Sequence, residues 1–478
     1  GKSLSYFAWA ERLQNQLAGK EQELLEPWKA TLASAAIAPE LPIGSGAESI
    51  SLGVEECRFD AQQTARLLSH APACYHQSPE ELVLAGVYLA LGQTFGVSQL
   101  GIDIEWHGRD EIIGGTEGLD RTLGWFTSVH PLFLALPDFP AQDSEQSLGH
   151  FLRYLKEERA AVPARGRDFY ALRYLSDHDE VKTAFRNYRA PSILFNFSGV
   201  IQRSTGSWKT LPVAAIEMGE GNQNPYLLSV ESEIRDGELI VGFYLDKSCW
   251  SQQQIASLQR NLQTGINAIV EHCINPVNQR WTPSDFPLVA ITAEEAAALP
   301  ENIIDLFPLT DMQQTLYRHR DTYQVWMHHE FKRKFDQEKF QAAVADWISL
   351  NACLRTLIHT RADGSVVQGV YASMPPQLML LNVAPGQRQN AAQELIAKGK
   401  NAPVEFTDNP AYTLHVLDAG DAAFSLVLSI HHIIHDGWTI ELLMDSLWRI
   451  YRSKLGETVN LPELSSTSVR DIFLEQQR

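Results

Sequence analysis

The stretch that most constrains the fold is residues 424–456, where a strand pattern, a histidine-rich segment and a helix pattern follow one another. Residues 424–430 read FSLVLSI, which nearly alternates polar and apolar and is rich in strand formers, so a strand is predicted. Beyond residue 437, apolar residues recur at helical spacing until Gly456, which predicts a helix that ends there. His431 and His432 therefore lie where a rigid strand gives way to a loop that leaves an imidazole accessible.

An imidazole titrates near neutral pH, so a histidine at this place can move protons or hold an attacking amine. Two simpler interpretations stay open from the residues alone. The paired histidines can be ordinary hydrogen-bonded core residues. His435 and Asp436 add donors for a zinc ion, but no further ligand cluster with familiar spacing follows, so no metal is predicted.

Composition limits the class of protein. A chain of 478 residues predicts two to four units, and 44% hydrophobic residues suit packed cores. The 39 basic residues face 58 acidic ones, and a net charge of -19 argues against nucleic-acid and anionic-membrane partners. Five scattered cysteines without CxxC pairs, no spanning apolar run and no signal peptide predict a reduced, cytoplasmic protein.

The first half of the chain places polar residues where strand patterns end. Residues 101–110 read GIDIEWHGRD, and charges at a strand end often mark only a solvated edge. Residues 227–245 alternate on either side of Asp236-Gly237, which predicts a β-hairpin. Three further stretches stand out: residues 121–131, RTLGWFTSVHP; residues 163–170, PARGRDFY; and residues 195–199, FNFSG.

Residues 431–437, HHIIHDG, resemble the HHxxxDG signature of the condensation-domain superfamily of nonribosomal peptide synthetases. In that family the second histidine, here His432, lies at the centre of a tunnel between two lobes, so the resemblance implies a catalytic role. It also implies that His431 and Gly437 shape the loop and that Asp436 pairs with an arginine.

The expected partner of Asp436 is Arg355. Residues 351–356, NACLRT, resemble the second family motif, RHExLRT, and an arginine inside an apolar segment usually needs a buried partner. Heterocyclization domains carry aspartates at the positions of His431 and His432, so ring formation is the less favoured activity.

The four stretches of the first half follow the order and spacing of the C-terminal lobe of an epimerization domain, a branch of the same superfamily. The family patterns are EGHGRE, RTVGWFTxxYP, PxxGxGYG and FNYLG. Glu105 matches the family's catalytic glutamate, and the same resemblance makes site-shaping residues of His107, Arg109, Trp125 and Asn196. The chain departs from these patterns at Trp106, Asp110, His130, Ala171, Phe197 and Ser198, which leaves substrate choice and activity open.

The order of the motifs predicts the domain organisation. Residues 282–288, TPSDFPL, are irregular and resemble the tail that ends such domains, whereas residues 307–314, FPLTDMQQ, resemble the opening of a condensation domain. Residues 2–9 are loosely repeated 465 residues later at 467–474, which indicates one period of a tandem array cut between lobes.

We therefore predict an epimerization-domain-like C-terminal lobe over 1–285, a linker over 286–302 and the N-terminal lobe of a condensation domain over 303–478. The expected fold is α/β, with two lobes like chloramphenicol acetyltransferase, each a mixed sheet with flanking helices. Each lobe would supply half of a site. A chimeric tunnel that joins Glu105 and His432 is one hypothesis, since an extended linker of this length reaches about 50–60 Å.

The resemblance implies acyl groups carried as thioesters on the phosphopantetheine arm of carrier proteins, with no tightly bound cofactor and with neighbouring synthetase domains as partners. Glu105 would exchange the α-proton, opposite a histidine of a lobe that the chain lacks, and His432 would orient or deprotonate the attacking amine. Two alternatives remain. Trp106 and Ser198 favour an inactive binding platform, and HxxxD is shared with acyltransferases that use coenzyme A, although those lack the paired histidines and RTLGWFT.

Overall fold

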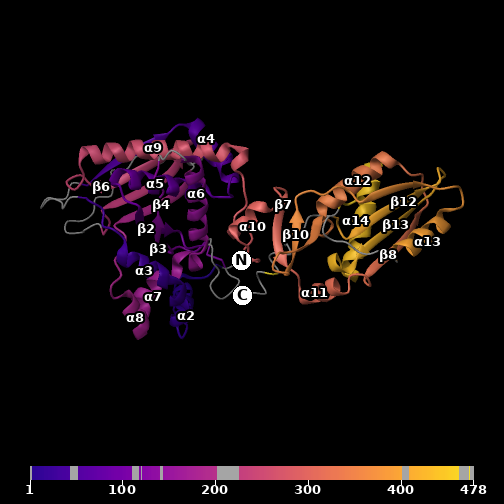
Figure 1. Cartoon of the computed structure of the whole chain (residues 1–478), viewed down its shortest axis with the longest axis horizontal. Coiled ribbons are helices and arrows are strands. Elements are labelled where there is room, and N and C mark those ends of the chain that lie inside the picture. The colour runs from indigo at the N-terminus through magenta and orange to yellow at the C-terminus, as the bar shows by residue number, and fades with distance from the viewer. Residues whose placement is uncertain are drawn as a thin grey trace. The chain divides into compact units, whose positions relative to one another are not determined.

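The computed structural model describes residues 3–43, 52–109, 118–119, 121–139, 144–201, 225–400, 409–461 and 473. The chain divides into two compact units, Gly1–Ser284 and Asp285–Arg478, and both are α/β (Figure 1). Asp110 and most of the predicted repeat over 467–474 lie outside the described residues. Within the described ranges, no helix is both long and apolar enough to cross a membrane.

A six-stranded mixed sheet forms the centre of the first unit. Its strand order is β1-β6-β5-β4-β2-β3, and β4 runs parallel to both of its neighbours while the other adjacent pairs are antiparallel. The predicted hairpin is confirmed, because β5 and β6 turn at Asp236 and Gly237, both with positive φ. In chain order the strands are β1 (Leu52–Phe59), β2 (Gln99–Trp106), β3 (Ser128–Ala135), β4 (Ile193–Ile201), β5 (Leu228–Arg235) and β6 (Glu238–Asp246).

Long helices cover one face of this sheet. Helix α5 (Pro79–Phe95) is buried along its middle, which suits its apolar residues on every side, and α9 (Gln252–Ile274) packs on it (Figure 1). A Cβ at Gly86 would overlap Ile266 of α9, so the glycine lets the two helices approach closely. Residues of the sheet that face these helices, such as Ile102, Ile104 and Phe195, are fully buried in the main core.

A second, smaller core lies at the β3 end of the first unit. Helix α7 (Arg167–Leu175) packs on β3, and Trp28, Phe169 and Leu172 belong to this core. The remaining polar face of β2, β4 and β5 carries half-buried side chains. The other helices of this unit are α1 (Tyr6–Leu17), α2 (Glu21–Leu25), α3 (Lys29–Ile37), α4 (Ala61–Ser69), α6 (Ser144–Ala160) and α8 (Asp179–Phe185).

The second unit is built on a four-stranded mixed sheet of order β11-β12-β13-β8. Helices α12 (Gln337–Leu350) and α14 (Gly437–Lys454) pack together, and the Trp347 indole donates a hydrogen bond to the carbonyl of Leu443 at 2.8 Å. Leu428 belongs to the core under these helices, whereas Val427 contacts the cluster of α13 (Arg388–Gly399), so β13 is buried on both faces. The strands are β8 (Gln324–Phe331), β11 (Leu378–Asn382), β12 (Tyr412–Asp418) and β13 (Phe424–His431).

The second unit also contains an antiparallel three-stranded sheet of order β7-β10-β9, which the prediction of one mixed sheet per lobe did not anticipate. Its strands are β7 (Ile303–Pro308), β9 (Thr356–Thr360) and β10 (Val366–Tyr371), and α11 (Asp311–Arg318) follows β7. The segment predicted as a linker belongs to this unit and forms α10 (Ala293–Ala298). Glu295 of α10 binds the Arg361 guanidinium at 2.9 Å, and the linker role itself stays a prediction.

Candidate active sites

The first of the paired histidines is a structural part of its loop. Strand β13 ends at His431, which is fully buried. Its Nδ1 accepts a hydrogen bond from the Ile433 amide at 3.0 Å, and its Nε2 donates to the carbonyl of Arg320 at 2.9 Å. This pattern fits a neutral ring, and burial lowers the pKa of His431 to about 4. His431 therefore holds its loop in place, and its implied part in shaping a site stays a prediction.

The second histidine is held by ring packing instead. His432 is half-buried, and its ring stacks on that of His435 with centroids 4.5 Å apart and meets Tyr323 edge-on at 6.5 Å. Its backbone amide donates to the Tyr323 carbonyl at 3.1 Å. Among the described residues, no side-chain hydrogen bond or ion pair engages the His432 ring. The imidazole is thus fixed in place while its nitrogens stay available to a ligand.

The expected ion pair between Arg355 and Asp436 is wrong for this structure, in which both residues are described. The Arg355 guanidinium donates to backbone carbonyls, and three of these contacts span 3.1–3.4 Å. The acceptors are the carbonyls of Ile348, Ser349, Tyr371 and Ala372. The Asp436 carboxylate instead caps α14 and accepts from the amide and the hydroxyl of Thr439 at 2.7 and 2.6 Å. These bonds lower the pKa of Asp436.

Gly437 is the first residue of α14, and an added Cβ would meet no atom within 4 Å. It is not among the glycines with positive φ. Neither space nor backbone conformation therefore requires glycine at this position, and its implied part in shaping the site stays a prediction.

The carboxylate site of the first unit lies on the polar face of the sheet. Glu105 is near the end of β2, half-buried and opposite Val129 of β3. Burial raises the pKa of Glu105. Asn196 of β4 lies on the neighbouring strand, and its amide donates to Glu231 of β5 at 2.9 Å. The structure thus brings two of the predicted site residues, Glu105 and Asn196, onto adjacent strands.

Two acidic residues of this face were missed from the sequence. Burial raises the pKa of Glu231 to about 7, and the charge of Glu105 adds to that rise. Asp103, two residues before Glu105, is fully buried and accepts hydrogen bonds from the hydroxyls of Tyr226 and Tyr170 at 2.9 and 3.2 Å. Burial raises the pKa of Asp103 to about 6. The polar members of the alternating hairpin strand were the available signal for Glu231, but that pattern equally fits a solvated face.

Arg109 and His107 organise the loop that follows β2. The Arg109 guanidinium donates to the carbonyls of Leu119 and Thr122, both at 2.9 Å, and lies 4.4 Å from the Phe126 ring. The His107 Nδ1 accepts from the Arg109 amide at 3.1 Å. These contacts make both residues local supports of the loop.

Aromatic side chains around Glu105 differ in exposure. Trp125 is 76% exposed, so it packs against little within the first unit. The Trp106 ring, which replaces a glycine of the family pattern, stacks on His107 and lies 4.8 Å from the Arg165 guanidinium. The bulky ring next to Glu105 therefore has its own packing partners.

A hollow of about 670 Å³ lies on the first unit near β3, and Glu105 is not among the described residues that line it. It is lined by Val129, which faces Glu105 across the ladder, and by Tyr170 and Tyr226, the two tyrosines that hold Asp103. Arg173 and Phe126 contribute a cation and an aromatic ring. The space is large enough for a substrate group and lies on the same unit as the carboxylates.

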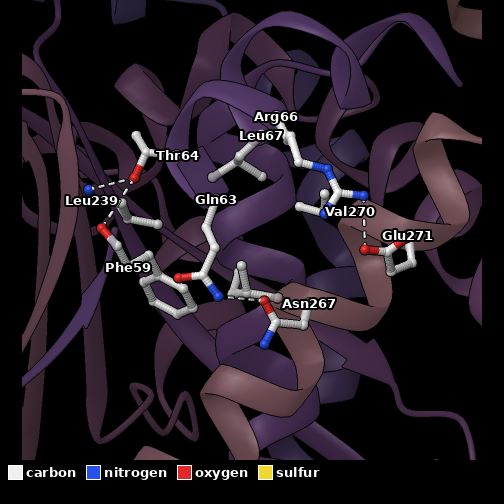
Figure 2. A pocket seen from close by; sticks show the side chains of 10 residues that line it. Phe59, Gln63, Thr64, Arg66, Leu67, Leu239, Asn267, Val270 and Glu271 are labelled. Atoms are coloured by element: carbon white, nitrogen blue, oxygen red, sulfur yellow. Dashed lines mark hydrogen bonds and ion pairs between the residues drawn. The ribbon is translucent and has the colours of Figure 1, made fainter. Parts of the chain in front are cut away.

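The pocket in Figure 2 is not a ligand site. It lies between α4 and α9 and offers about 10 Å³, roughly the least that one water needs. Its polar groups already bind one another: Gln63 donates to Asn267 at 3.0 Å, and Arg66 pairs with Glu271 at 2.7 Å (Figure 2). In the described part of the chain, no three His, Cys, Asp or Glu side chains gather to hold a metal ion.

Comparison with known proteins places these features in a family. The model of the condensation domain matches residues 1–291 and 303–478. The chain therefore belongs to the condensation-domain family, and the prediction of an α/β fold with lobes like chloramphenicol acetyltransferase is confirmed.

Two curated relatives are nonribosomal peptide synthetases. A linear gramicidin synthase of Brevibacillus parabrevis is 26% identical over 490 residues, which cover 94% of this chain and 6% of that protein. A mycosubtilin synthase of Bacillus subtilis is 24% identical over 475 residues, with coverages of 94% and 18%. The chain thus spans only a small part of these relatives.

Among solved structures, the epimerization domain from the third module of tyrocidine synthetase B is similar with a TM-score of 0.50 and 25% identity. The match covers 57% of this chain and 60% of that one.

Proposed function

We propose that the chain supplies two half-sites to a nonribosomal peptide synthetase. The first unit contributes the Glu105 carboxylate to epimerization of a carrier-bound aminoacyl or peptidyl thioester. The second unit contributes the His432 imidazole to amide-bond formation with the next carrier-bound amino acid. The matches to synthetases and to an epimerization domain support this division of work.

Epimerization needs a base that reaches the α-carbon next to a thioester. Glu105 lies half-buried on the polar face of the sheet, opposite Val129, which lines the hollow. Burial raises the pKa of Glu105 toward neutrality, which makes the carboxylate a stronger base. The α-proton passes to the carboxylate and leaves an enolate on the thioester. A proton returned from the opposite face, by a group of the complementary lobe, completes the inversion.

Condensation needs an amine free to attack a thioester carbonyl. His432 offers ring nitrogens that no described side chain occupies, and this observation carries the proposal for the second unit. The imidazole accepts or orients the amine proton while the amide bond forms and the pantetheine thiol leaves. Both substrates arrive on phosphopantetheine arms, so carrier proteins and neighbouring synthetase domains are the proposed partners.

The test measures both reactions in a synthetase polypeptide that carries these residues. For epimerization, gain of solvent deuterium at the α-carbon of the carrier-bound acyl group is followed by mass spectrometry. We expect Glu105→Gln to slow exchange by about 100-fold or more, since an acid–base group contributes roughly 10²–10⁴-fold. Glu233→Gln is the matched control, because Glu233 pairs with Arg235. Equal exchange in Glu105→Gln and wild type would refute the role of Glu105.

For condensation, peptide formed per carrier is quantified. We expect His432→Ala to lower the rate by about 100-fold or more, whereas the exposed His328→Ala does not. Unchanged peptide output in His432→Ala would support the second candidate, an inactive platform that recruits partner proteins. The missing Arg355–Asp436 pair is the observation that favours this second candidate.

A further inference from the structure

Three polar residues form a row across the first unit's sheet. In the parallel ladder of β2 and β4, Ile104 lies opposite Phe195, so Glu105 is level with Asn196 one residue further. In the ladder of β4 and β5, Asn196 lies opposite Glu231. Because neighbouring strands are ~4.8 Å apart, the two glutamates project from backbones about 10 Å apart with Asn196 between them.

Hydrogen bonds tie the middle of this row to β5. The Asn196 amide donates to Glu231 Oε2 at 2.9 Å, and the Ser232 hydroxyl donates to the Asn196 carbonyl at 2.9 Å. Both bonds join β4 to β5; the bond to Glu231 fixes the direction of the Asn196 side chain, and the Ser232 bond holds its backbone carbonyl. One side of the row is therefore held rigidly, while Glu105 stands at the other end.

The charges of this face are not balanced evenly. Glu56 pairs with Arg58, and Glu233 pairs with Arg235. In the described part of the chain, no ion pair is formed by Glu105 or by Glu231. Two half-buried carboxylates without a paired cation repel each other. Protonation of one carboxylate removes this repulsion and makes it easier for the other to stay ionised.

We propose that Glu231 is a positioning residue of the Glu105 site, which holds the Asn196 amide and carries the proton that lets Glu105 stay ionised. The inference rests on the proposed role of Glu105 in epimerization. Glu231 itself touches no reacting atom in this scheme. It keeps the pair of Glu105 and Glu231 at a single negative charge, and a single charge on the pair opposes the developing enolate less than two would.

The surroundings of Glu231 agree with this role. The groups that influence its titration are Glu105 on β2, Asn196 on β4 and Glu233 on β5, and burial has the largest effect. Tyr244 of β6 lies within the field of Glu231, and Tyr226 within that of Glu105. Burial and Glu105 raise the pKa of Glu231 to about 7, so Glu231 is protonated on the acidic side of neutrality.

Titration of the carboxyl groups tests the coupling without any turnover. The full chain is labelled at the glutamate side-chain carboxyl carbon with ¹³C, and its NMR signals are followed from about pH 4 to about pH 9. We expect the Glu231 midpoint to fall by about half a pH unit or more in Glu105→Gln, because Glu231 titrates while Glu105 is already ionised. The Glu105 midpoint should change little in Glu231→Gln, because Glu231 is still protonated where Glu105 titrates. A Glu231 midpoint that does not move in Glu105→Gln would overturn the proposal.

Glu233→Gln serves as the matched control, since Glu233 lies on the same strand and is already paired with Arg235. We expect a smaller fall of the Glu231 midpoint in this variant than in Glu105→Gln. An equal shift in both variants would also overturn the proposal, because it would show a general loss of negative charge and no specific pair.

The pH profile of α-proton exchange separates the two tasks of Glu231. In wild type, exchange should decline above about pH 7, where Glu231 ionises. Glu231→Gln keeps an oxygen that can accept from Asn196 and is permanently neutral, so exchange should persist in this variant without that decline. Glu231→Ala removes the acceptor as well, and exchange should fall about 10-fold at every pH. Identical pH profiles in wild type and Glu231→Gln would show that Glu231 does not hold the proton. Unchanged exchange in Glu231→Ala would show that Glu231 does not position Asn196. Loss of exchange in Glu105→Gln would still support the proposed function.

Discussion

The two candidate sites, the histidine loop and the Glu105 site, are held in different ways. The histidine loop of the second unit is organised within one short stretch, where His431 bonds its own loop, His435 packs on His432 and Asp436 caps the next helix. The Glu105 site is assembled from strands that are far apart in the sequence, with Asn196 and Glu231 on β4 and β5. A sequence motif therefore describes nearly all of the histidine loop, but only the Glu105 end of the carboxylate site.

The largest effect should come from Arg355, which lies outside the histidine loop. Replacing it by Met removes the guanidinium donors from the carbonyls of Ser349 in α12 and Tyr371 in β10, and we expect a loss of about 2–4 kcal/mol of unfolding free energy. Denaturant unfolding of the second unit measures it. Combination with Asp436→Ala should be additive, because the two side chains do not pair. A coupling energy above about 0.5 kcal/mol between the two substitutions would be evidence that Arg355 and Asp436 do form an ion pair.

His431 should matter for stability and His432 for chemistry. We expect His431→Phe to cost about 1–3 kcal/mol, since the Ile433 amide and the Arg320 carbonyl lose their buried partner. His432→Ala should cost less than half of that, because its ring makes no described hydrogen bond. Thermal unfolding of both variants checks the difference. Equal losses would mean that the two rings have the same structural task.

Asp103 should make the stability of the first unit depend on pH. Its pKa is about 6 in the folded chain against a reference of 3.8, so the folded state binds more protons between those values. The resulting stability is fully present below about pH 4 and is lost as the pH rises through about 6. Hydrogen exchange of β2 amides should show this fall in wild type. In Asp103→Asn we expect the free energy of unfolding to fall by about 1–2 kcal/mol less over this pH range than in wild type. An equal fall in both proteins would assign the pH dependence to other groups.

The smallest effect is expected at Gly437. Alanine meets no atom there and favours the first turn of α14, so Gly437→Ala should leave condensation unchanged and raise stability by up to about 1 kcal/mol. Peptide formation and thermal unfolding of the same variant check both parts. A marked loss of peptide formation would show that the loop needs glycine, as the family motif implied.

The sequence predicted what local patterns encode. The strand that ends at His431, the helix after Gly437 and the Asp236-Gly237 hairpin each follow from spacing or turn chemistry within a few residues, and all are present. The Arg355–Asp436 pair was inferred from a resemblance, and the structure gives each residue a nearer partner.

Glu231 and Asp103 could not be found in the same way. A glutamate on an alternating strand normally faces water, and only the register with β4 shows that Glu231 meets Asn196. Asp103 owes its burial to tyrosines 67 and 123 positions away in the chain, a distance at which no local pattern carries information. Such residues become visible only when the order of the strands is known.

Strand β13 is buried along its whole length, between β12 and β8 and with packed side chains on both faces. A strand enclosed in this way tolerates few substitutions that change side-chain size or shape, so the backbone from which the histidines project is fixed. Variants that probe His432 should therefore leave strand β13 unchanged. Transferring residues 431–437 to another protein without strand β13 would transfer His432 without the buried strand that fixes its position.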